Sequence, residues 1–104
     1  MNETEQIKVK ITEKNGKSIF KEWFAGLENK AKTQIIRRFA QVTTGNLGDH
    51  KYLREKVSEL RFRDGHRIYY TMISPDMLLL LGGTKSSQNR DIERAIKWLK
   101  ELEK

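Results

Sequence analysis

The spacing of apolar residues predicts a strand and then a short helix at the start of the chain. Apolar residues alternate with lysines over residues 7–11 (IKVKI), which is the two-residue period of a half-buried strand, and Asn15-Gly16 then supplies a turn. From Ser18, the predicted N-cap, the spacing becomes helical. The aromatic stripe of this helix is expected in the core and consists of Phe20, Trp23, Phe24 and Leu27.

A second helix is predicted to be capped by Asn29 and to end at residues 44–46 (TGN). One of its faces is apolar, while its other faces carry lysine and arginine, so the two helices would form a hairpin over a sheet. Residues 45–56 contain Gly, Asn, Asp, His and basic residues but little apolar material. They are predicted to form a loop.

The second half of the chain predicts three antiparallel strands and a final helix. Residues 58–63 (SELRFR) and 67–73 (RIYYTMI) are expected to form a hairpin around a turn at residues 64–66. Residues 77–81 (MLLLL) are apolar on both faces, which is typical of an interior strand that is covered on both sides. Ser86 or Ser87 would then cap a helix whose apolar stripe runs from Ile92 to Leu102.

This order of elements predicts an α+β fold. A small antiparallel sheet, made of the N-terminal strand and a C-terminal three-strand meander, would carry the helical hairpin and the C-terminal helix. The 104 residues suffice for one hydrophobic core but not for two independently stable ones. We therefore expect a single domain over residues 1–104.

The predicted hairpin gathers arginines on one face. A three-residue turn would pair Arg63 with Arg67 and would point Leu60, Phe62, Ile68, Tyr70 and Met72 inward. The outer surface would then carry Arg61, Arg63, Arg67 and Tyr69. Opposed like charges destabilise a sheet, whereas the planar donor fork of arginine suits phosphate. A phosphate-rich ligand would explain the cluster; the alternative is an exposed strand face in an arginine-rich protein.

Composition narrows the choice of partner and of chemistry. The net charge of +7 and the pI near 9.8 favour a polyanion or an acidic protein as the partner. The absence of cysteine excludes disulfides and thiolate metal sites, and we expect no metal and no cofactor. Residues 82–85 (GGTK) bring Lys85 to the rim of the sheet but lack the spacing of a nucleotide-binding loop. Without a signal core or a membrane-spanning run, the chain is expected in the cytoplasm, away from membranes.

Several segments, in this order and spacing, together resemble one known family. They are residues 45–51 (GNLGDHK), 59–61 (ELR), 65–70 (GHRIYY) and 80–88 (LLGGTKSSQ), followed by Asp91-Ile92 and Ala95. The chain thereby resembles the HigB-type "addiction module killer" branch of the RelE/ParE toxin superfamily, which includes phage-derived toxin-like proteins. The resemblance covers about residues 18 to 102.

This resemblance implies a RelE-like sheet flanked by helices and a type II toxin–antitoxin module. The partners would be a cognate helix-turn-helix antitoxin, mRNA and the ribosome, with operator DNA reached through the antitoxin. A bound antitoxin could also be the second cover of the apolar strand. By position, Arg61 and Arg67 match the basic hairpin residues of the family, and Lys85 matches a basic residue at the end of the last strand. His66 stands where the family usually has the Tyr of Gly-Pro-Gly-Tyr-Arg, either replacing an aromatic that stacks on a base or bringing different chemistry.

RNA cleavage without a metal needs a base for the 2′-hydroxyl, cations for the phosphorane and an acid for the leaving 5′-oxygen. Our hypothesis is that Arg61 and Arg67 hold the phosphorane with help from Arg63. Proton transfer would fall to Lys85, Lys51 or a histidine, either His50 or His66. The predicted RNA contacts are Lys51, Arg63, His66, Gln88 and Tyr69, the last by stacking on a base.

Two further functions fit the sequence. One is a ParE-like protein that inhibits DNA gyrase and cuts nothing. The other is a noncatalytic nucleic-acid-binding domain, which would bind RNA with strong salt dependence and leave it intact.

Overall fold

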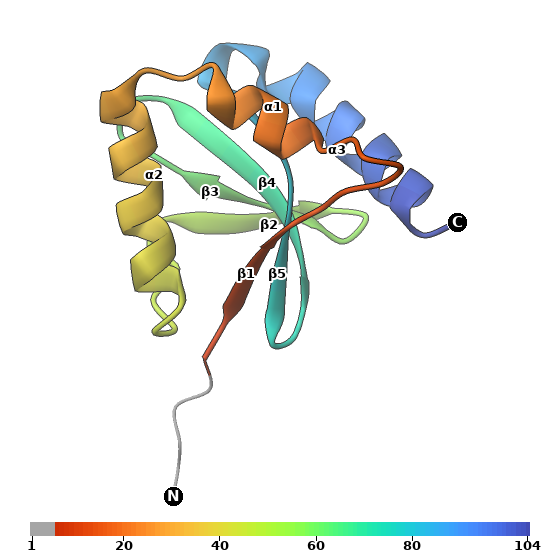
Figure 1. Cartoon of the computed structure of the whole chain (residues 1–104), viewed down its shortest axis with the longest axis horizontal. Coiled ribbons are helices and arrows are strands. Elements are labelled where there is room, and N and C mark those ends of the chain that lie inside the picture. The colour runs from red at the N-terminus through yellow and green to blue at the C-terminus, as the bar shows by residue number, and fades with distance from the viewer. Residues whose placement is uncertain (1–5) are drawn as a thin grey trace, which may run out of the picture.

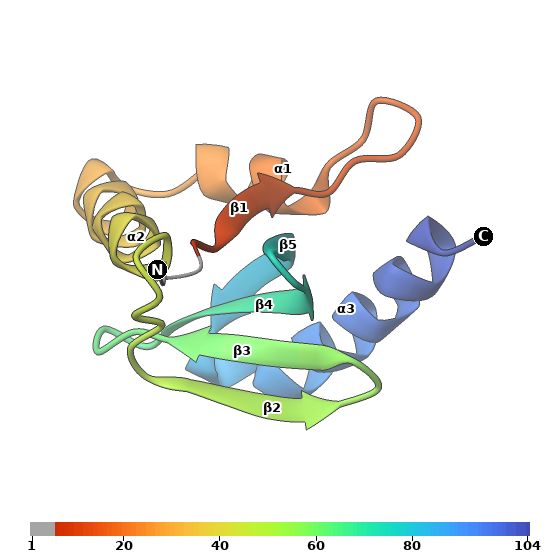
Figure 2. The ribbon, with the colours of Figure 1, turned by 90° about the horizontal axis from the view of Figure 1, so that it is seen from below.

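A five-stranded sheet with helices on both faces makes up the structure, a computed structural model that describes residues 6–104 (Figures 1 and 2). In chain order the elements are β1 (Lys8–Ile11), α1 (Ile19–Ala25), α2 (Asn29–Val42), β2 (His50–Arg54), β3 (Val57–Arg61), β4 (His66–Ile73), β5 (Asp76–Thr84), a 3₁₀ turn (Lys85–Ser87) and α3 (Gln88–Leu102). The α+β prediction is confirmed. Residues 1–5, where the predicted domain begins, lie outside the described residues.

The sheet is mixed, whereas a purely antiparallel one was predicted. Its strand order is β1-β5-β4-β3-β2, in which β1 runs parallel to β5 and every other neighbouring pair is antiparallel. Because α1 and α2 carry the chain across one face between β1 and β2, these two strands occupy opposite edges of the sheet. The chain leaves β1 through the two helices and comes back beside it only with β5. This long connection allows β5 to run parallel to β1.

The segment predicted as a loop, residues 45–56, contains the edge strand β2. Its turn residues Glu55 and Lys56 both have positive φ, 49° and 71°, which is the conformation of a tight hairpin turn. The sequence does not indicate this turn, because neither residue is Gly or Asn, the residues that most often adopt positive φ. Edge position also explains the polar composition of β2, because only Leu53 packs against the core.

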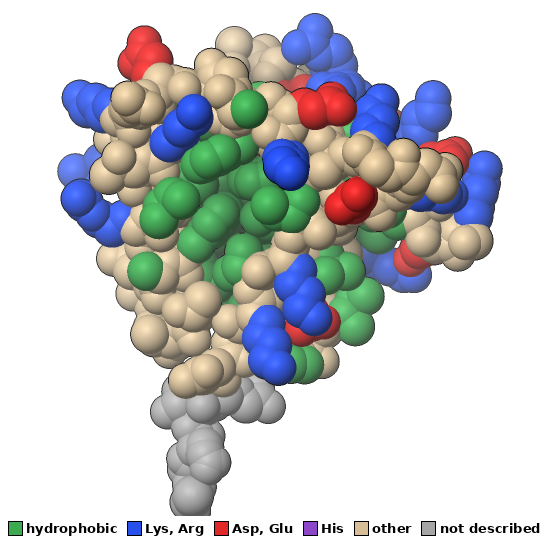
Figure 3. Space-filling model, viewed as in Figure 1, with side chains coloured by type: hydrophobic (Ala, Val, Ile, Leu, Met, Phe, Trp, Pro, Cys, Tyr) green, Lys and Arg blue, Asp and Glu red, His purple; other side chains and the backbone are tan. Residues whose placement is uncertain are grey.

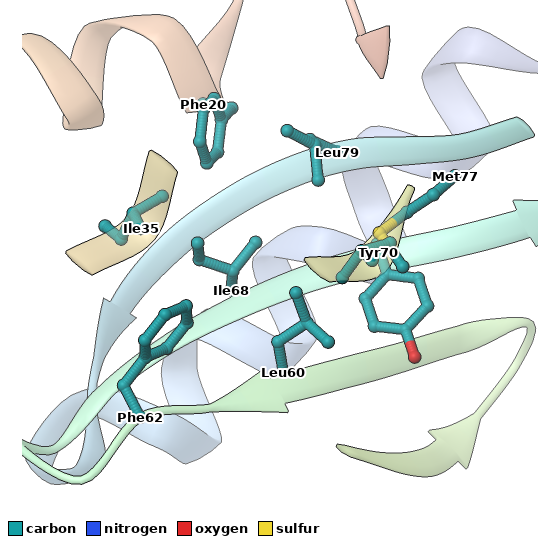
Figure 4. Close-up of a cluster of buried hydrophobic side chains, with 9 residues drawn as sticks. Phe20, Ile35, Leu60, Phe62, Ile68, Tyr70, Met77 and Leu79 are labelled. Carbon is teal, nitrogen blue, oxygen red and sulfur yellow. The ribbon is translucent and has the colours of Figure 1, made fainter. Parts of the chain in front are cut away.

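Helices α1 and α2 cover one face of the sheet (Figure 2). Ser18 caps α1 as predicted and accepts a hydrogen bond from the backbone of Lys21 at 3.2 Å. Asn29, predicted to cap α2, is instead its first helical residue, and Glu28 takes the N-cap position without a side-chain hydrogen bond. Figure 4 shows the core beneath these helices, where inward side chains of β3, β4 and β5 meet Phe20 and Ile35. Met72, predicted to point inward, is 37% exposed near the end of β4.

Helix α3 covers the other face. Leu80 and Leu81 of β5 pack there against Ala95, Ile96 and Leu99, so the second cover of the apolar strand is α3 itself and not a bound antitoxin. This packing also buries Tyr69, which was predicted to lie on an outer surface. The sequence pattern separated the two faces of the hairpin correctly but could not show that both were covered.

Gly82 and Gly83 lie within β5 and let a helix approach each face closely. A Cβ at residue 82 would lie 2.3 Å from the nearest ring atom of Trp23 in α1. A Cβ at residue 83 would lie 1.9 Å from Asp91 Oδ2 in α3. The glycine pair is therefore required by the packing of two helices on opposite sides of one strand.

Candidate functional site

Arg61 and Arg67 are direct partners across β3 and β4, on the face that α3 covers. The predicted pairing of Arg63 with Arg67 is wrong by two residues, because the turn lies one residue earlier and Phe62 pairs with His66 through a 3.0 Å backbone hydrogen bond. A shift of two residues preserves the face of every side chain. The prediction that Arg61 and Arg67 share one face was right, although α3 covers most of that face, whereas Arg63 lies in the loop beyond β3.

A buried carboxylate lies next to this arginine pair. Glu59 has no exposed surface, and its Oε2 accepts a hydrogen bond from Arg61 Nε at 2.7 Å. Its Oε1 accepts one from Gln88 Nε2 at 2.9 Å. This hydrogen bond to Glu59 raises the pKa of Arg61, so the guanidinium stays charged. Gln88, predicted as an RNA contact, is thus engaged with Glu59.

Arg67 is held by backbone carbonyls. Its Nη1 donates to His66 O at 3.1 Å and lies 3.5 Å from Phe62 O, whereas its Nε is buried without a partner. Gly83, opposite Arg67 on β5, contributes no side chain to this row. Together, Arg61 and Arg67 place two guanidinium groups on neighbouring strands near the beginning of α3.

Lys85 lies at the same end of the sheet. Its backbone N–H donates to Gly65 O at 2.8 Å, which ties the 3₁₀ turn to the β3–β4 loop, and its side chain is exposed. Residues 85–90 line a polar hollow of about 480 Å³, which includes Gln88 and Arg90. The structure thus brings Lys85 to the end of the sheet that carries the arginine pair, whereas the sequence predicted only that it lies at the rim of the sheet.

The remaining predicted site residues separate into two groups. Lys51 pairs with Glu59 across β2 and β3, is exposed, and belongs to the arginine face. Arg63 is exposed in the β3–β4 loop. His66 belongs to the other face, where its ring lies 6.0 Å from that of Trp23, and its Nδ1 is 2.8 Å from Asp64 Oδ2. His50 pairs with Leu60 on that same face. Neither histidine therefore joins Arg61 and Arg67.

Asp64 anchors the loop that carries Arg63. Burial alone would raise the pKa of Asp64, but hydrogen bonds from the backbone and ring of His66 outweigh this effect and lower it. His66 is thereby engaged in holding the turn.

Tyr69 is buried beside the site, with its hydroxyl lacking a hydrogen-bond partner. A side chain with no exposed surface cannot stack on a base, so the predicted role of Tyr69 is wrong for this structure. Burial, followed by the nearby carboxylates of Glu59 and Asp91, raises the pKa of Tyr69.

Replacing Tyr69 by phenylalanine is expected to protect the fold at high pH. Above the ordinary tyrosine pKa of about 10, the unfolded chain ionises while folded Tyr69 keeps its proton. This contribution to stability is complete below that pH and is lost above it, by up to about 1.4 kcal/mol per pH unit. Urea unfolding of wild type and Tyr69→Phe at pH values around 9 to 11 would measure the difference. Equal slopes against pH would contradict it.

The sequence analysis missed Glu59 and Asp91 as parts of the site. Asp91 is buried, accepts a hydrogen bond from Ser87 Oγ and lies 3.6 Å from Arg94 Nη1. The signal that could have found Glu59 is its spacing of two residues from Val57 on β3. This spacing places both side chains on the same face of the strand, which α3 covers.

The described residues include no group of three or more His, Cys, Asp and Glu side chains that could hold a metal ion. Over residues 6–104, no helix combines the length and the apolar character needed to cross a membrane.

Comparison with known proteins identifies one clear relative. No family model matches the chain. An uncharacterized protein from Haemophilus influenzae is 35% identical over 96 residues, an alignment that covers 88% of this chain and 90% of the relative. Identity of this level over nearly the whole length of both proteins shows common descent. The chain therefore belongs to the same family as this Haemophilus influenzae protein.

Proposed function

We propose that this protein is the toxin of a type II toxin–antitoxin module, of the RelE/ParE type, and that it cleaves RNA without a metal. The observation that carries the proposal is the pairing of Arg61 with Arg67 across neighbouring strands, at the end of the sheet where Lys85 emerges. Like charges in direct register oppose folding. Glu59 offsets the charge of Arg61, whereas within residues 6–104 Arg67 has no carboxylate partner, so a polyanionic ligand would offset the charge that remains. The net charge of +7 also favours a polyanionic ligand.

Each group has a role in the proposed reaction. The guanidinium groups of Arg61 and Arg67 stabilise the charge of the phosphorane formed when the 2′-hydroxyl attacks the adjacent phosphorus. Arginine is a poor proton carrier because it stays charged. The histidines lie on the other face, so proton transfer falls to Lys85 or Lys51, which are exposed near the pair. One group removes the 2′-hydroxyl proton, and another protonates the 5′-oxygen as its bond to phosphorus breaks.

The proposed protein partner is an acidic antitoxin. Figure 3 shows apolar side chains gathered between α1, α2 and β1, with lysine, arginine and also acidic side chains around them. Ile36 of α2 is 58% exposed and lines a hollow of about 520 Å³ with Phe24, Lys32 and Arg37. An antitoxin segment with both acidic and apolar residues would complement such a surface.

Induced expression in a bacterial host tests the proposed function. Growth and the 5′ ends of cellular mRNAs would be followed for the wild type and for Arg67→Ala. We expect growth arrest with new mRNA ends for the wild type, and neither for the variant. Arg67 is chosen for replacement because removing Arg61 would also leave buried Glu59 without its charged partner.

The other outcomes identify the alternatives. Arrest with intact mRNA and induction of the DNA-damage response would favour a ParE-like gyrase inhibitor. Normal growth, combined with salt-dependent RNA binding by the purified protein, would favour a noncatalytic nucleic-acid-binding domain. Either result would overturn the nuclease proposal.

A further inference from the structure

Glu59 is a carboxylate with no exposed surface, on the face of the sheet that α3 covers. Its neighbours on the α3 face include Val57 on its own strand and Tyr69 on β4, both without exposed surface. Burying a carboxylate is unfavourable unless hydrogen bonds and an opposite charge compensate for the lost water. A buried ion pair such as that of Glu59 with Arg61 is often no more stabilising than apolar residues of similar size. The presence of glutamate here therefore needs an explanation other than the stability of the core.

Hydrogen bonds fix both oxygens of the Glu59 carboxylate. Arg61 Nε donates to Oε2 at 2.7 Å, and Gln88 Nε2 donates to Oε1 at 2.9 Å. Gln88 begins α3, so the carboxylate joins that helix to β3. Strand pairing holds the backbone of Glu59, and Gln88 is part of a helix that packs on the sheet. The Arg61 side chain, in contrast, is 33% exposed.

The contact with Glu59 uses only the inner nitrogen of the Arg61 guanidinium. Within residues 6–104, neither terminal nitrogen of Arg61 donates a hydrogen bond, and neither is buried without a partner. Two parallel donors on a planar group are what a phosphate binds in a bidentate manner. Binding through Nε thus leaves the outer edge of Arg61 available. The same hydrogen bond restrains the orientation of the Arg61 side chain.

We propose that Glu59 is a positioning residue, which holds Arg61 through Nε so that both terminal nitrogens face a phosphate, and that Gln88 in turn positions Glu59. This inference rests on the proposed RNA cleavage. On this proposal, the two arginines are oriented toward phosphate by different groups. Arg61 is preorganised by a carboxylate, whereas Arg67 is held by backbone carbonyls. It also changes the role of Gln88 from RNA contact to support.

The test compares the direction of the change in RNA affinity with the direction of the change in cleavage rate. Glu59→Leu removes a negative charge, so nonspecific attraction to RNA should increase or stay equal. Loss of orientation should nevertheless lower cleavage, because misplaced catalytic groups lose most of their effect. We expect kcat to fall about 100-fold for Glu59→Leu, with Kd for a 2′-O-methyl RNA unchanged or tighter. Gln88→Leu keeps the charge and should lower kcat about 10-fold, also with little change in Kd.

Matched controls separate positioning from charge and from folding. Glu93→Gln removes a carboxylate from the exposed face of α3 and should cleave RNA like the wild type. Glu59→Gln removes the same charge as Glu59→Leu but keeps an oxygen acceptor for Arg61 Nε, so it should recover at least part of the lost rate. Cleavage by Glu59→Leu within about twofold of the wild type would overturn the proposal. So would parallel losses of kcat, RNA affinity and melting temperature, which would indicate a purely structural role.

A readout without catalysis distinguishes failure of this inference from failure of the proposed function. In nitrogen-15 spectra, the Arg61 Nε–H should exchange with water at least about 10-fold faster in Glu59→Leu than in the wild type. Inorganic phosphate should shift the Arg61 side-chain resonance of the wild type more strongly than that of the variant. If the wild type cuts no RNA but shows both effects, the nuclease proposal fails and the positioning of Arg61 stands. Equal exchange rates and equal phosphate shifts would overturn the positioning.

Discussion

Purified protein with Arg67→Ala is expected to cleave RNA at least about 100-fold more slowly than the wild type, because one preorganised donor to the transition state is commonly worth this much. The loss should appear in kcat, since Arg67 is proposed to bind the phosphorane more strongly than the ground-state phosphate. The folded state should persist, because the hydrogen bonds of the guanidinium go to nearby backbone carbonyls and not to another side chain. Single-turnover cleavage of a short RNA, with circular dichroism of each variant, would measure both effects.

Arg37→Ala is the matched control for this experiment. Arg37 is exposed on α2, on the opposite face of the sheet from Arg67, and its removal changes the net charge by the same amount. It should leave kcat unchanged and weaken RNA binding only slightly, through the general electrostatic attraction. If Arg67→Ala and Arg37→Ala lower cleavage equally, the arginine pair has no specific catalytic part. The basic charge of the protein would then account for any effect on RNA.

Gly83→Ala is expected to destabilise the fold by about 3 kcal/mol, at the upper end of what overpacking usually costs. The added Cβ would lie 1.9 Å from Asp91 Oδ2 and 3.1 Å from Ser87 Oγ. Asp91 is buried and accepts a hydrogen bond from Ser87, so it cannot move aside without exposing or unpairing its carboxylate. The start of α3 would have to move away from β5, and Gln88 would move with it. Urea unfolding would measure the change in the free energy of unfolding.

Gly26→Ala is the control, because the surroundings of Gly26 have room for an added Cβ. Gly26 follows α1 with φ of −86°, and a Cβ there would meet no heavy atom closer than 3.7 Å. Its replacement should change the free energy of unfolding by less than about 1 kcal/mol. A double variant, Gly83→Ala with Asp91→Ser, should regain part of the stability lost by Gly83→Ala, because the shorter side chain makes room. Absence of any loss in Gly83→Ala itself would show that α3 does not approach β5 so closely.

The sequence by itself determined most elements of this fold, because their signals are local. Alternation over residues 7–11 indicated β1, and helical spacing after Ser18 and Asn29 indicated α1 and α2. The apolar run at residues 77–81 indicated an interior strand. Alternation also placed Arg61 and Arg67 on the same face of the hairpin, and this survived the error in register because a shift of two residues leaves faces unchanged.

Tertiary structure decided what these local signals could not contain. Strand β2 exists because β3 offers it a partner, and its own sequence has too few apolar residues to predict it. The parallel placement of β1 depends on the path of the helices across the sheet. Sequence pattern shows that a face is apolar or polar, but burial depends on what packs against that face. For this reason Tyr69 and Glu59 could be assigned their true surroundings only once α3 was seen to cover them.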